Sequence, residues 1–277
     1  MLDKGFICEV APRDGLQSAS IIYSVQKRVR FIENLLASGL TQIEVGSLVR
    51  ADLVPAMADS DKVFQSLQEK HPESVWKNFI LLVPNEKGLE KALSFHCRFV
   101  AFFTATSETF NQKNIRMSVA DSITRIENMM QSLPSNVRSR LYISTVFDCP
   151  FEGTMPVEKL KPFENLMLMA DEVSLGDTTG KGKASQIPAI HEIVKNLNIT
   201  DKIFWHFHDT YLQAEDNVQQ AIELGYLKFD SSAGGIGGCP FAPGAKGNIA
   251  TEKVIRIFQK NNINIDVDVE KLKQAVL

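Results

Sequence analysis

The sequence lacks the features that mark membrane, secreted and nucleic-acid-binding proteins. Apolar runs such as residues 99–103 are far shorter than the ~20 residues that span a bilayer. The first five residues contain no charged segment followed by an apolar one, so we expect no signal peptide. The formal net charge of −3 gives no electrostatic reason to expect nucleic acid or an anionic membrane as a partner. An anionic substrate would need a local basic site.

Cysteine is scarce and irregularly placed. The chain has four cysteines, Cys8, Cys97, Cys149 and Cys239, and none of them forms a CxxC pair. This spacing argues against a disulfide framework and a zinc ribbon, and it predicts a reduced, cytoplasmic location. The chain also lacks a linker, a low-complexity tract or a shift in composition. We therefore expect one domain over residues 1–277.

Two apolar periodicities alternate along the chain. Helical periodicity is clear in residues 25–38, which follow the N-cap residue Ser24 and stop at Gly39. It recurs in residues 118–133, 157–170, 185–197, 213–224 and 251–260. Strand-like segments occupy residues 6–11, 42–46, 76–83, 98–104, 140–147, 172–175, 202–208 and 228–232. This alternation predicts a parallel sheet, and eight repeats fit a closed (β/α)8 TIM barrel with a C-terminal helical extension better than an open sheet.

Unusual polar residues fall at or near the ends of the predicted strands. They are Arg13, Asp14, Glu44, Asn85, Asp148, Asp177, His206 and His208. In a barrel, the carboxyl ends of all strands meet on one face, where active sites are built. The sequence therefore predicts a functional site on that face.

The first candidate metal ligands are two histidines at positions i and i+2 of a predicted strand. His206 and His208 would point to the same face and bind one cation. Asp14 is the natural third ligand, because only the eighth strand would separate the first strand from the seventh. Asn248, in the loop after the eighth strand, is the fourth candidate. The alternatives are a packed histidine pair, an Asx turn before Gly15 and a helix N-cap at residue 248.

These four candidates combine one carboxylate, two imidazoles and one amide oxygen, without a thiolate. Such donors suit an octahedral Mg²⁺ or Mn²⁺ that keeps positions for substrate oxygens, rather than a structural zinc.

Residues 233–244 form a segment rich in glycine and proline around Cys239. Its glycines permit positive φ and close backbone approach, and such a segment can act as a lid over bound substrate. A thiol in this place can donate or accept a proton, although most free cysteines are small buried hydrophobic residues. The residues alone leave both interpretations of Cys239 open.

Three charged residues each have a catalytic and a structural interpretation. Arg13 can stabilise an enolate oxygen, or it can form a structural ion pair with Glu44. Glu44 can hold Arg13 or a metal-bound water in place. Asp177 can orient or deprotonate a substrate hydroxyl, or it can cap the end of its strand before Thr178.

Several segments together resemble the hydroxymethylglutaryl-CoA lyase family. The resemblance covers nearly the whole chain in order, and the cysteine loop is its most specific part. The matching segments are residues 9–17 (EVAPRDGLQ), 113–115 (KNI), 149–153 (CPFEG), 174–178 (SLGDT), 206–211 (HFHDTY) and 231–252.

The resemblance implies a divalent-metal lyase that cleaves 3-hydroxy-3-methylglutaryl-CoA into acetyl-CoA and acetoacetate, and it suggests a homodimer. By the resemblance, Arg13 contacts the substrate and Cys239 is catalytic. Asp14, His206, His208 and Asn248 would bind the metal, and Glu44 and Asp177 are also implicated. In this mechanism Arg13 offsets the enolate charge, and Cys239 or His206 returns a proton to carbon.

The chain departs from the family's pattern at several positions. These are residues 51–53, Leu212, Phe241, Pro243 and Lys246. None of them is a proposed metal ligand, so the departures concern the identity of the substrate and the mobility of the loop more than the type of reaction.

Four alternative functions can be compared with these residues. A lyase for other 3-hydroxy-3-alkylglutaryl-CoA esters fits the same residues. Barrels that condense acetyl-CoA with a 2-oxo acid resemble this chain at Arg13, Asp14 and the two histidines, but they typically carry a further C-terminal region and lack the cysteine loop. Biotin-dependent carboxyltransferases need a metal-bridging lysine on a barrel strand, and residues 140–147 contain none. A non-catalytic binding barrel would not need all four ligand candidates together with Cys239.

Overall fold

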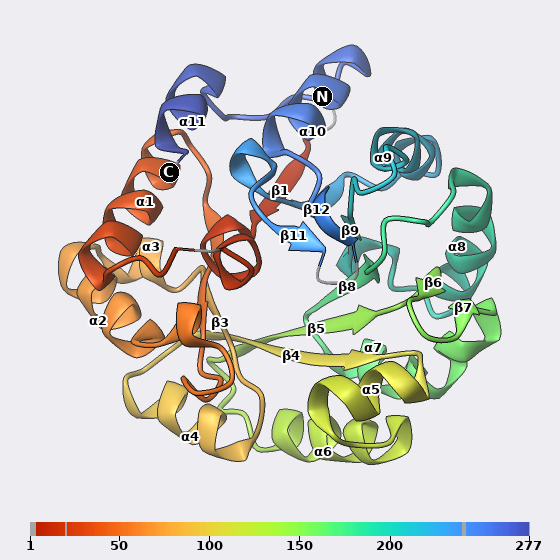
Figure 1. Ribbon diagram of the computed structural model, residues 1–277, viewed down its shortest axis with the longest axis horizontal. Helices are drawn as coiled ribbons and strands as arrows, with labels where there is room; N and C mark the ends of the chain where they lie inside the picture. Colours follow the sequence, from red (N-terminus) through yellow and green to blue (C-terminus); the bar gives the residue numbers. More distant parts are fainter. Residues whose placement is uncertain (1–3, 20, 240–241, 277) are drawn as a thin grey trace.

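The structure, a computed structural model, describes residues 4–19, 21–239 and 242–276, with the backbone alone for residues 238–239 and 242–246. Eight parallel strands close into a barrel (Figure 1). Around the barrel they follow the order of the sequence: β1 (Phe6–Glu9), β2 (Gln42–Ser47), β3 (Phe79–Leu82), β4 (Phe99–Ala105), β5 (Arg138–Ser144), β8 (Glu172–Asp177), β9 (Ile203–Phe207) and β10 (Lys228–Ser231). The prediction of a (β/α)8 barrel is confirmed.

Helices surround the barrel, and each barrel strand is followed by at least one of them (Figure 1). They are α1 (Val25–Ala37), α2 (Ser60–Lys70), α3 (Glu73–Trp76), α4 (Glu86–Ser94), α5 (Glu108–Ile115), α6 (Val119–Gln131), α7 (Glu164–Met169), α8 (Ile187–Asn196), α9 (Ala214–Glu223), α10 (Thr251–Lys260) and α11 (Val269–Ala275). Helix α11 packs against α1 and forms the predicted C-terminal extension. Within the described ranges, no helix is long and apolar enough to cross a membrane.

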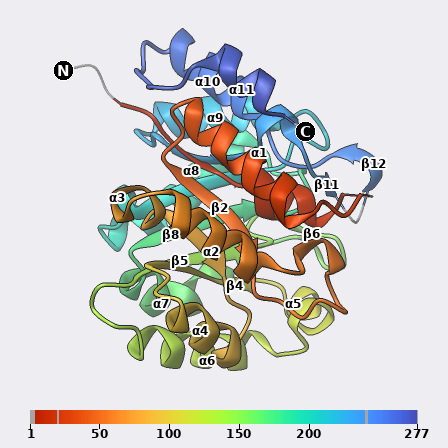
Figure 2. The ribbon, with the colours of Figure 1, turned by 90° about the vertical axis from the view of Figure 1, so that its left-hand side faces the viewer.

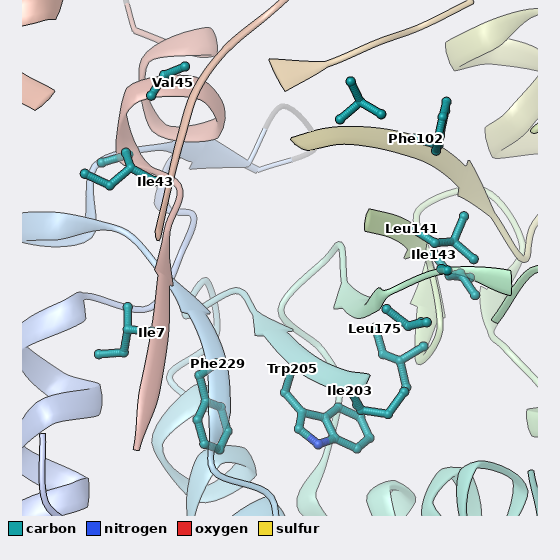
Figure 3. Packing of buried hydrophobic residues seen from close by; sticks show 14 of the residues in the cluster. Ile7, Ile43, Val45, Phe102, Leu141, Ile143, Leu175, Ile203, Trp205 and Phe229 are labelled. Carbon is teal, nitrogen blue, oxygen red and sulfur yellow. The ribbon is translucent and has the colours of Figure 1, made fainter. Parts of the chain in front are cut away.

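Alternating side chains along the strands create two apolar clusters. Ile7, Trp205 and Phe229 point outward and pack in the cluster that the helices cover (Figure 3). Their chain neighbours Cys8 and Phe204 belong to a smaller cluster inside the barrel. Because successive residues of a strand face opposite sides, one sequence pattern builds both clusters.

The barrel also encloses a buried charged network. The fully buried Arg140 on β5 donates hydrogen bonds to Glu172 on β8 and to Asp230 on β10. Gln42 on β2 donates to Glu172 at 2.8 Å, and Ser174 Oγ donates to Asp230 Oδ2 at 2.7 Å. Because each charge has a partner of opposite sign, the network can lie inside the barrel.

Several predicted boundaries are wrong. The strand predicted over residues 76–83 begins only at Phe79, and Trp76 instead ends helix α3. The strand predicted over residues 6–11 ends at Glu9, and Ala11 opens a π-helix, η1 (Ala11–Gly15). The helix predicted over residues 157–170 divides into a 3₁₀ segment, η3 (Val157–Phe163), and α7. Pro162 lies within η3 and has no N–H to donate, which explains why a continuous α-helix does not form there.

Two short hairpins extend from the ends of barrel strands. Strands β6 (Asp148–Cys149) and β7 (Gly153–Thr154) follow β5, and β11 (Gly238–Cys239) and β12 (Ala242–Lys246) follow β10. Figure 2 shows β6 and the β11–β12 hairpin at the same side of the molecule. This is the side at which the carboxyl ends of the barrel strands emerge.

Candidate active site

A cavity of about 460 Å³ opens at the carboxyl ends of the barrel strands. Its wall includes Arg13 and Asp14 from η1, Tyr142 from β5, and His206 and His208 from the end of β9. The structure therefore brings together residues that are almost two hundred positions apart in the sequence.

The π-helix η1 aims Arg13 and Asp14 at this cavity. The backbone N–H groups of Arg13, Asp14 and Gly15 all donate to the carbonyl oxygen of Val10, at 3.1, 2.8 and 3.2 Å. π-Helical turns are rare in proteins, but those that occur often lie at functional sites. The tight turn after β1 thus presents two consecutive charged side chains to the same space.

Arg13 is held by two carboxylates. Its Nε donates to Glu44 Oε2 at 2.7 Å, and its Nη1 donates to Asp14 Oδ1 at 2.6 Å. The predicted ion pair between Arg13 and Glu44 is present, and Glu44 is fully buried. Burial alone would lower the pKa of Arg13, but the charges of Glu44 and Asp14 raise it, so the guanidinium stays charged.

Three candidate metal ligands converge beside Arg13. Asp14, His206 and His208 each offer one ligand atom, and these atoms lie within 4.8 Å of one another. The Nε2 atoms of the two histidines are 3.3 Å apart. Adjacent ligands on an octahedral cation with bonds of about 2.1 Å are roughly 3 Å apart. The donor set therefore fits a divalent cation.

The protonation of these side chains suits metal binding. Burial and the neighbouring His206 lower the pKa of His208 to about 4, which leaves a neutral imidazole near pH 7. Burial would raise the pKa of Asp14, but the charge of Arg13 and the two histidines lower it well below its ordinary value. Asp14 is thus an anion and His208 a lone-pair donor, the forms that bind cations.

Asn248 lies next to Asp14 and His208. Its Nδ2 donates to Asp14 Oδ2 at 2.7 Å, and its backbone forms an isolated β-bridge with His208. The alternative role as a helix N-cap is wrong, because the N-cap of α10 is Ala250. Asn248 therefore joins the other three candidates in space.

A comparison with known proteins assigns the chain to a family. The profile of the HMGL-like family matches residues 5–276. The chain belongs to the HMGL-like family.

Two relatives of this HMGL-like chain are named as lyases. It is 35% identical over 274 residues to a hydroxymethylglutaryl-CoA lyase of Bacillus subtilis, covering 97% of this chain and 90% of that protein. It is 38% identical over 272 residues to a 3-hydroxy-3-isohexenylglutaryl-CoA/hydroxymethylglutaryl-CoA lyase of Pseudomonas aeruginosa, covering 97% and 89%.

Solved structures of HMG-CoA lyases superpose on almost the whole chain. The crystal structure of the enzyme from Pseudomonas aeruginosa has a TM-score of 0.93 at 39% identity, covering 99% of this chain and 91% of that chain. An HMG-CoA lyase from Acinetobacter baumannii in complex with coenzyme A and 3-methylmalate has a TM-score of 0.91 at 31% identity, covering 99% and 89%.

Two site residues of this HMGL-like barrel were missed from the sequence. Asp230 accepts a hydrogen bond from His206 Nδ1, with 3.2 Å between Nδ1 and Oδ2. Tyr142 lines the cavity, with the Arg13 guanidinium 5.3 Å from its ring centre and the His206 ring edge-on at 6.3 Å. The sequence contains a signal for Asp230, because a buried strand rarely contains an aspartate without a partner. It contains no signal for Tyr142, since an aromatic residue is ordinary in a strand.

Asp177 lies beside the cavity rather than in its wall. Its Oδ1 accepts the N–H of Gly180 and its Oδ2 accepts the N–H of Gly182, both at 3.0 Å. Its chain neighbours Gly176 and Thr178 line the cavity instead. These contacts correspond to the structural interpretation of Asp177, in which it orders the turn after β8.

Cys239 belongs to β11, whose backbone pairs antiparallel with β12. Its side chain lies outside the part of the molecule that the structure describes. Phe241 lies outside the described residues as well.

Proposed function

We propose that this chain is a divalent-metal-dependent carbon–carbon lyase that cleaves 3-hydroxy-3-methylglutaryl-CoA into acetyl-CoA and acetoacetate. The observation that carries the proposal is the convergence of Asp14, His206 and His208 beside the charged Arg13 in one cavity. Membership of the HMGL-like family and the names of the relatives support the same reaction.

The cation would be held by Asp14, His206, His208 and the amide oxygen of Asn248. Oxygen and imidazole donors without a thiolate suit Mg²⁺ or Mn²⁺. When bound, such a cation would supply Lewis acidity that favours loss of the proton from the substrate hydroxyl.

Arg13 stabilises the negative charge that develops on the thioester oxygen as the carbon–carbon bond breaks. Its Nε and Nη1 are occupied by Glu44 and Asp14, which fix the plane of the guanidinium. Because its pKa is raised, Arg13 offers a permanent positive charge in a largely buried place, where electrostatic stabilisation is strong. Glu44 acts by holding Arg13 in this orientation.

A proton must return to the enolate carbon to give acetyl-CoA. Cys239 and His206 are the two candidate donors of this proton. The assignment of Asp177 to the substrate hydroxyl stays a prediction. Asp177→Asn should lower kcat strongly if that assignment holds.

The proposal is tested by incubating the purified chain with 3-hydroxy-3-methylglutaryl-CoA and either Mg²⁺ or Mn²⁺, and by measuring acetyl-CoA and acetoacetate. We expect equal amounts of both products and no reaction after chelation with EDTA. His208→Ala should abolish turnover and weaken Mn²⁺ binding in calorimetry. Cys239→Ala should abolish turnover while Mn²⁺ binding stays unchanged.

Failure of the wild-type chain to release acetyl-CoA with either cation would overturn the proposal. Normal turnover in His208→Ala or Cys239→Ala would refute the role of that residue. The homodimer expected from the family is a further prediction, which the molar mass from light scattering tests.

A further inference from the structure

Two candidate metal ligands, His208 and Asn248, lie opposite each other in a short antiparallel pairing of residues 207–209 with residues 247–249. One hydrogen bond joins the N–H of residue 249 to the carbonyl oxygen of residue 207 at 3.0 Å. The other joins the N–H of residue 209 to the carbonyl oxygen of residue 247 at 2.6 Å. Residues that lie between two such bonds form a non-hydrogen-bonded pair, in which the two side chains approach each other on one face. The backbone pairing thus brings the two ligands together.

This backbone pairing is too short to be rigid by itself. The bridge between His208 and Asn248 is isolated and belongs to no named strand. Even a complete two-stranded hairpin is only marginally stable in water. The spacing of the two ligands therefore depends on side chains that hold the paired segments together.

An ion pair on the opposite face of the pairing supplies this support. Asp209 follows His208 directly, so its side chain points to the other face of the extended chain. Lys253 on α10 donates to Asp209 Oδ2 at 2.8 Å and contacts Glu215 Oε1 on α9 at 2.7 Å. The Asp209 side chain is 2% exposed, and its Oδ1 has no hydrogen-bond partner among the described residues. Lys253 therefore balances a buried carboxylate charge.

Lys253 occupies a position where a helix disfavours a cation. The N-cap of α10 is Ala250, so Lys253 is the third residue of the helix. The N-terminus of a helix carries a partial positive charge, which favours carboxylates over ammonium groups. The two carboxylates that Lys253 contacts offset this unfavourable placement. The local preference of the helix does not explain a lysine here, whereas its contact with Asp209 does.

We propose that Lys253 is a positioning residue of the metal site. Through Asp209 it holds residues 207–209 against residues 247–249, and so keeps His208 and Asn248 at the spacing that one cation requires. Lys253 is not part of the cavity wall, so it acts through these residues and not on the substrate. The inference rests on the cation site of the proposed function, but it does not depend on which ester the chain cleaves.

The first test measures Mn²⁺ binding to the metal-free protein by calorimetry. Lys253→Met removes the charge and should weaken binding by about tenfold, the lower end of the range for groups that support a metal ligand. Lys91→Met is the matched control, because Lys91 on α4 also joins two helices, through Asp61 on α2, with 2.6 Å between Nζ and Oδ2. Lys91 contacts no residue of the metal site, so this variant should bind Mn²⁺ as wild type does.

A double variant tests whether the ion pair acts as a unit. Asp209→Asn removes the same contact from the other side and should weaken Mn²⁺ binding to a similar extent. Adding Lys253→Met to Asp209→Asn should weaken it no further, because both changes act through one contact. Glu215→Gln leaves the contact between Lys253 and Asp209 in place, so it should leave the affinity unchanged.

Hydrogen–deuterium exchange of the metal-free protein gives a readout that does not depend on the cation. Lys253→Met should speed exchange of the N–H groups of residues 209 and 249, which form the backbone pairing. The N–H of Asp14 donates to Val10 within η1 and should exchange as in wild type. Lys91→Met should change none of these rates.

Unchanged Mn²⁺ affinity in Lys253→Met would overturn the inference, and so would an equal loss in Lys91→Met or an additive loss in the double variant. Thermal unfolding verifies that each variant folds, and Asp209→Asn tests the same contact if Lys253→Met does not fold. A wild type that binds Mn²⁺ without cleaving the ester would refute the proposed lyase activity alone. A wild type that binds no Mn²⁺ would overturn both proposals.

Discussion

Asp230 on β10 accepts a hydrogen bond from His206 on the adjacent strand β9, with 3.2 Å between Oδ2 and Nδ1. A proton on Nδ1 leaves the lone pair of Nε2 free, and this is the nitrogen that faces His208. Asp230 is itself held by Arg140 and Ser174. The buried network of the barrel therefore sets the tautomer of a candidate metal ligand.

We predict that Asp230→Asn weakens Mn²⁺ binding by about 10–100-fold, the range typical for loss of such a hydrogen-bond partner. The neutral amide attracts the Nδ1 proton less strongly than the carboxylate does, and its NH2 group can donate to Nδ1 instead, so the preference for the Nδ1–H tautomer of His206 would be weakened. Isothermal titration calorimetry measures the affinity directly. Ser174→Ala is the matched control, because it removes another hydrogen bond to Asp230 but no contact of His206. An unchanged affinity in Asp230→Asn would refute the role of this aspartate.

The fold was predictable because its signals are local. Alternation along each strand and the helical periodicity of segments such as α1 are readable within a few residues, and eight repeats indicate closure. The predictions that failed also depended on local sequence signals, but these signals were weaker. At Trp76 aromatic character favoured a strand, but the residue belongs to a short helix that packs before β3. The π-helix at Ala11 has no pattern of its own, because one turn cannot show periodicity.

The site residues were predictable only where the order of strands around a closed barrel brings them together. Asp14 and the two histidines could be paired because strands one and seven flank strand eight, and the observed order of β1, β10 and β9 is the predicted one. The contact between Asp230 and His206 depends on the register of two strands, and this register cannot be inferred from the sequence. Whether Asp177 faces the cavity or its own turn depends on backbone geometry, and its two oxygens face the turn.

Arg13→Lys should reduce kcat by about 10²–10³-fold, the usual cost of removing one donor that stabilises a developing oxyanion. A lysine cannot contact Glu44 and Asp14 through separate nitrogens and still present a further donor to substrate. Steady-state kinetics with 3-hydroxy-3-methylglutaryl-CoA tests this prediction. Arg138→Lys, at the start of β5 and outside the cavity wall, should retain activity. Near-normal kcat in Arg13→Lys would contradict the proposed charge stabilisation.

Gly237→Ala should weaken cation binding by disturbing Asn248. Gly237 has φ of +137°, and a Cβ there would lie 3.0 Å from Asn248 Nδ2. Gly153 is the control, because its φ is +75° but a Cβ would meet nothing within 4 Å. Both substitutions should cost about 1 kcal/mol of stability through backbone strain. Only Gly237→Ala should lower the Mn²⁺ affinity, and equal affinities in the two variants would show that Asn248 is not displaced or does not bind metal.

Glu9 connects three segments around the start of the glycine-rich loop. Its Oε1 accepts the N–H groups of Ala11 and Ala233, both at 2.9 Å, and its Oε2 accepts the hydroxyl of Thr251 at 2.7 Å. The side chain is fully buried, and this burial raises its pKa from about 4.5 to about 7 despite the hydrogen bonds. The folded protein therefore holds the Glu9 proton more tightly than the unfolded chain does.

Glu9→Gln should accordingly change how stability depends on pH. In wild type the unfolded chain loses the proton first, so the contribution of Glu9 to stability falls as pH rises from about 4.5 to about 7. The full loss is roughly 3 kcal/mol. Glutamine does not ionise, so the variant should lack this loss and gain stability relative to wild type between pH 5 and pH 8. Urea unfolding at several pH values measures the difference, with Glu252→Gln, a less buried carboxylate that accepts the Gly234 N–H, as the control. If Glu9→Gln and wild type follow parallel pH curves, Glu9 is ionised to the same extent in the folded and unfolded states.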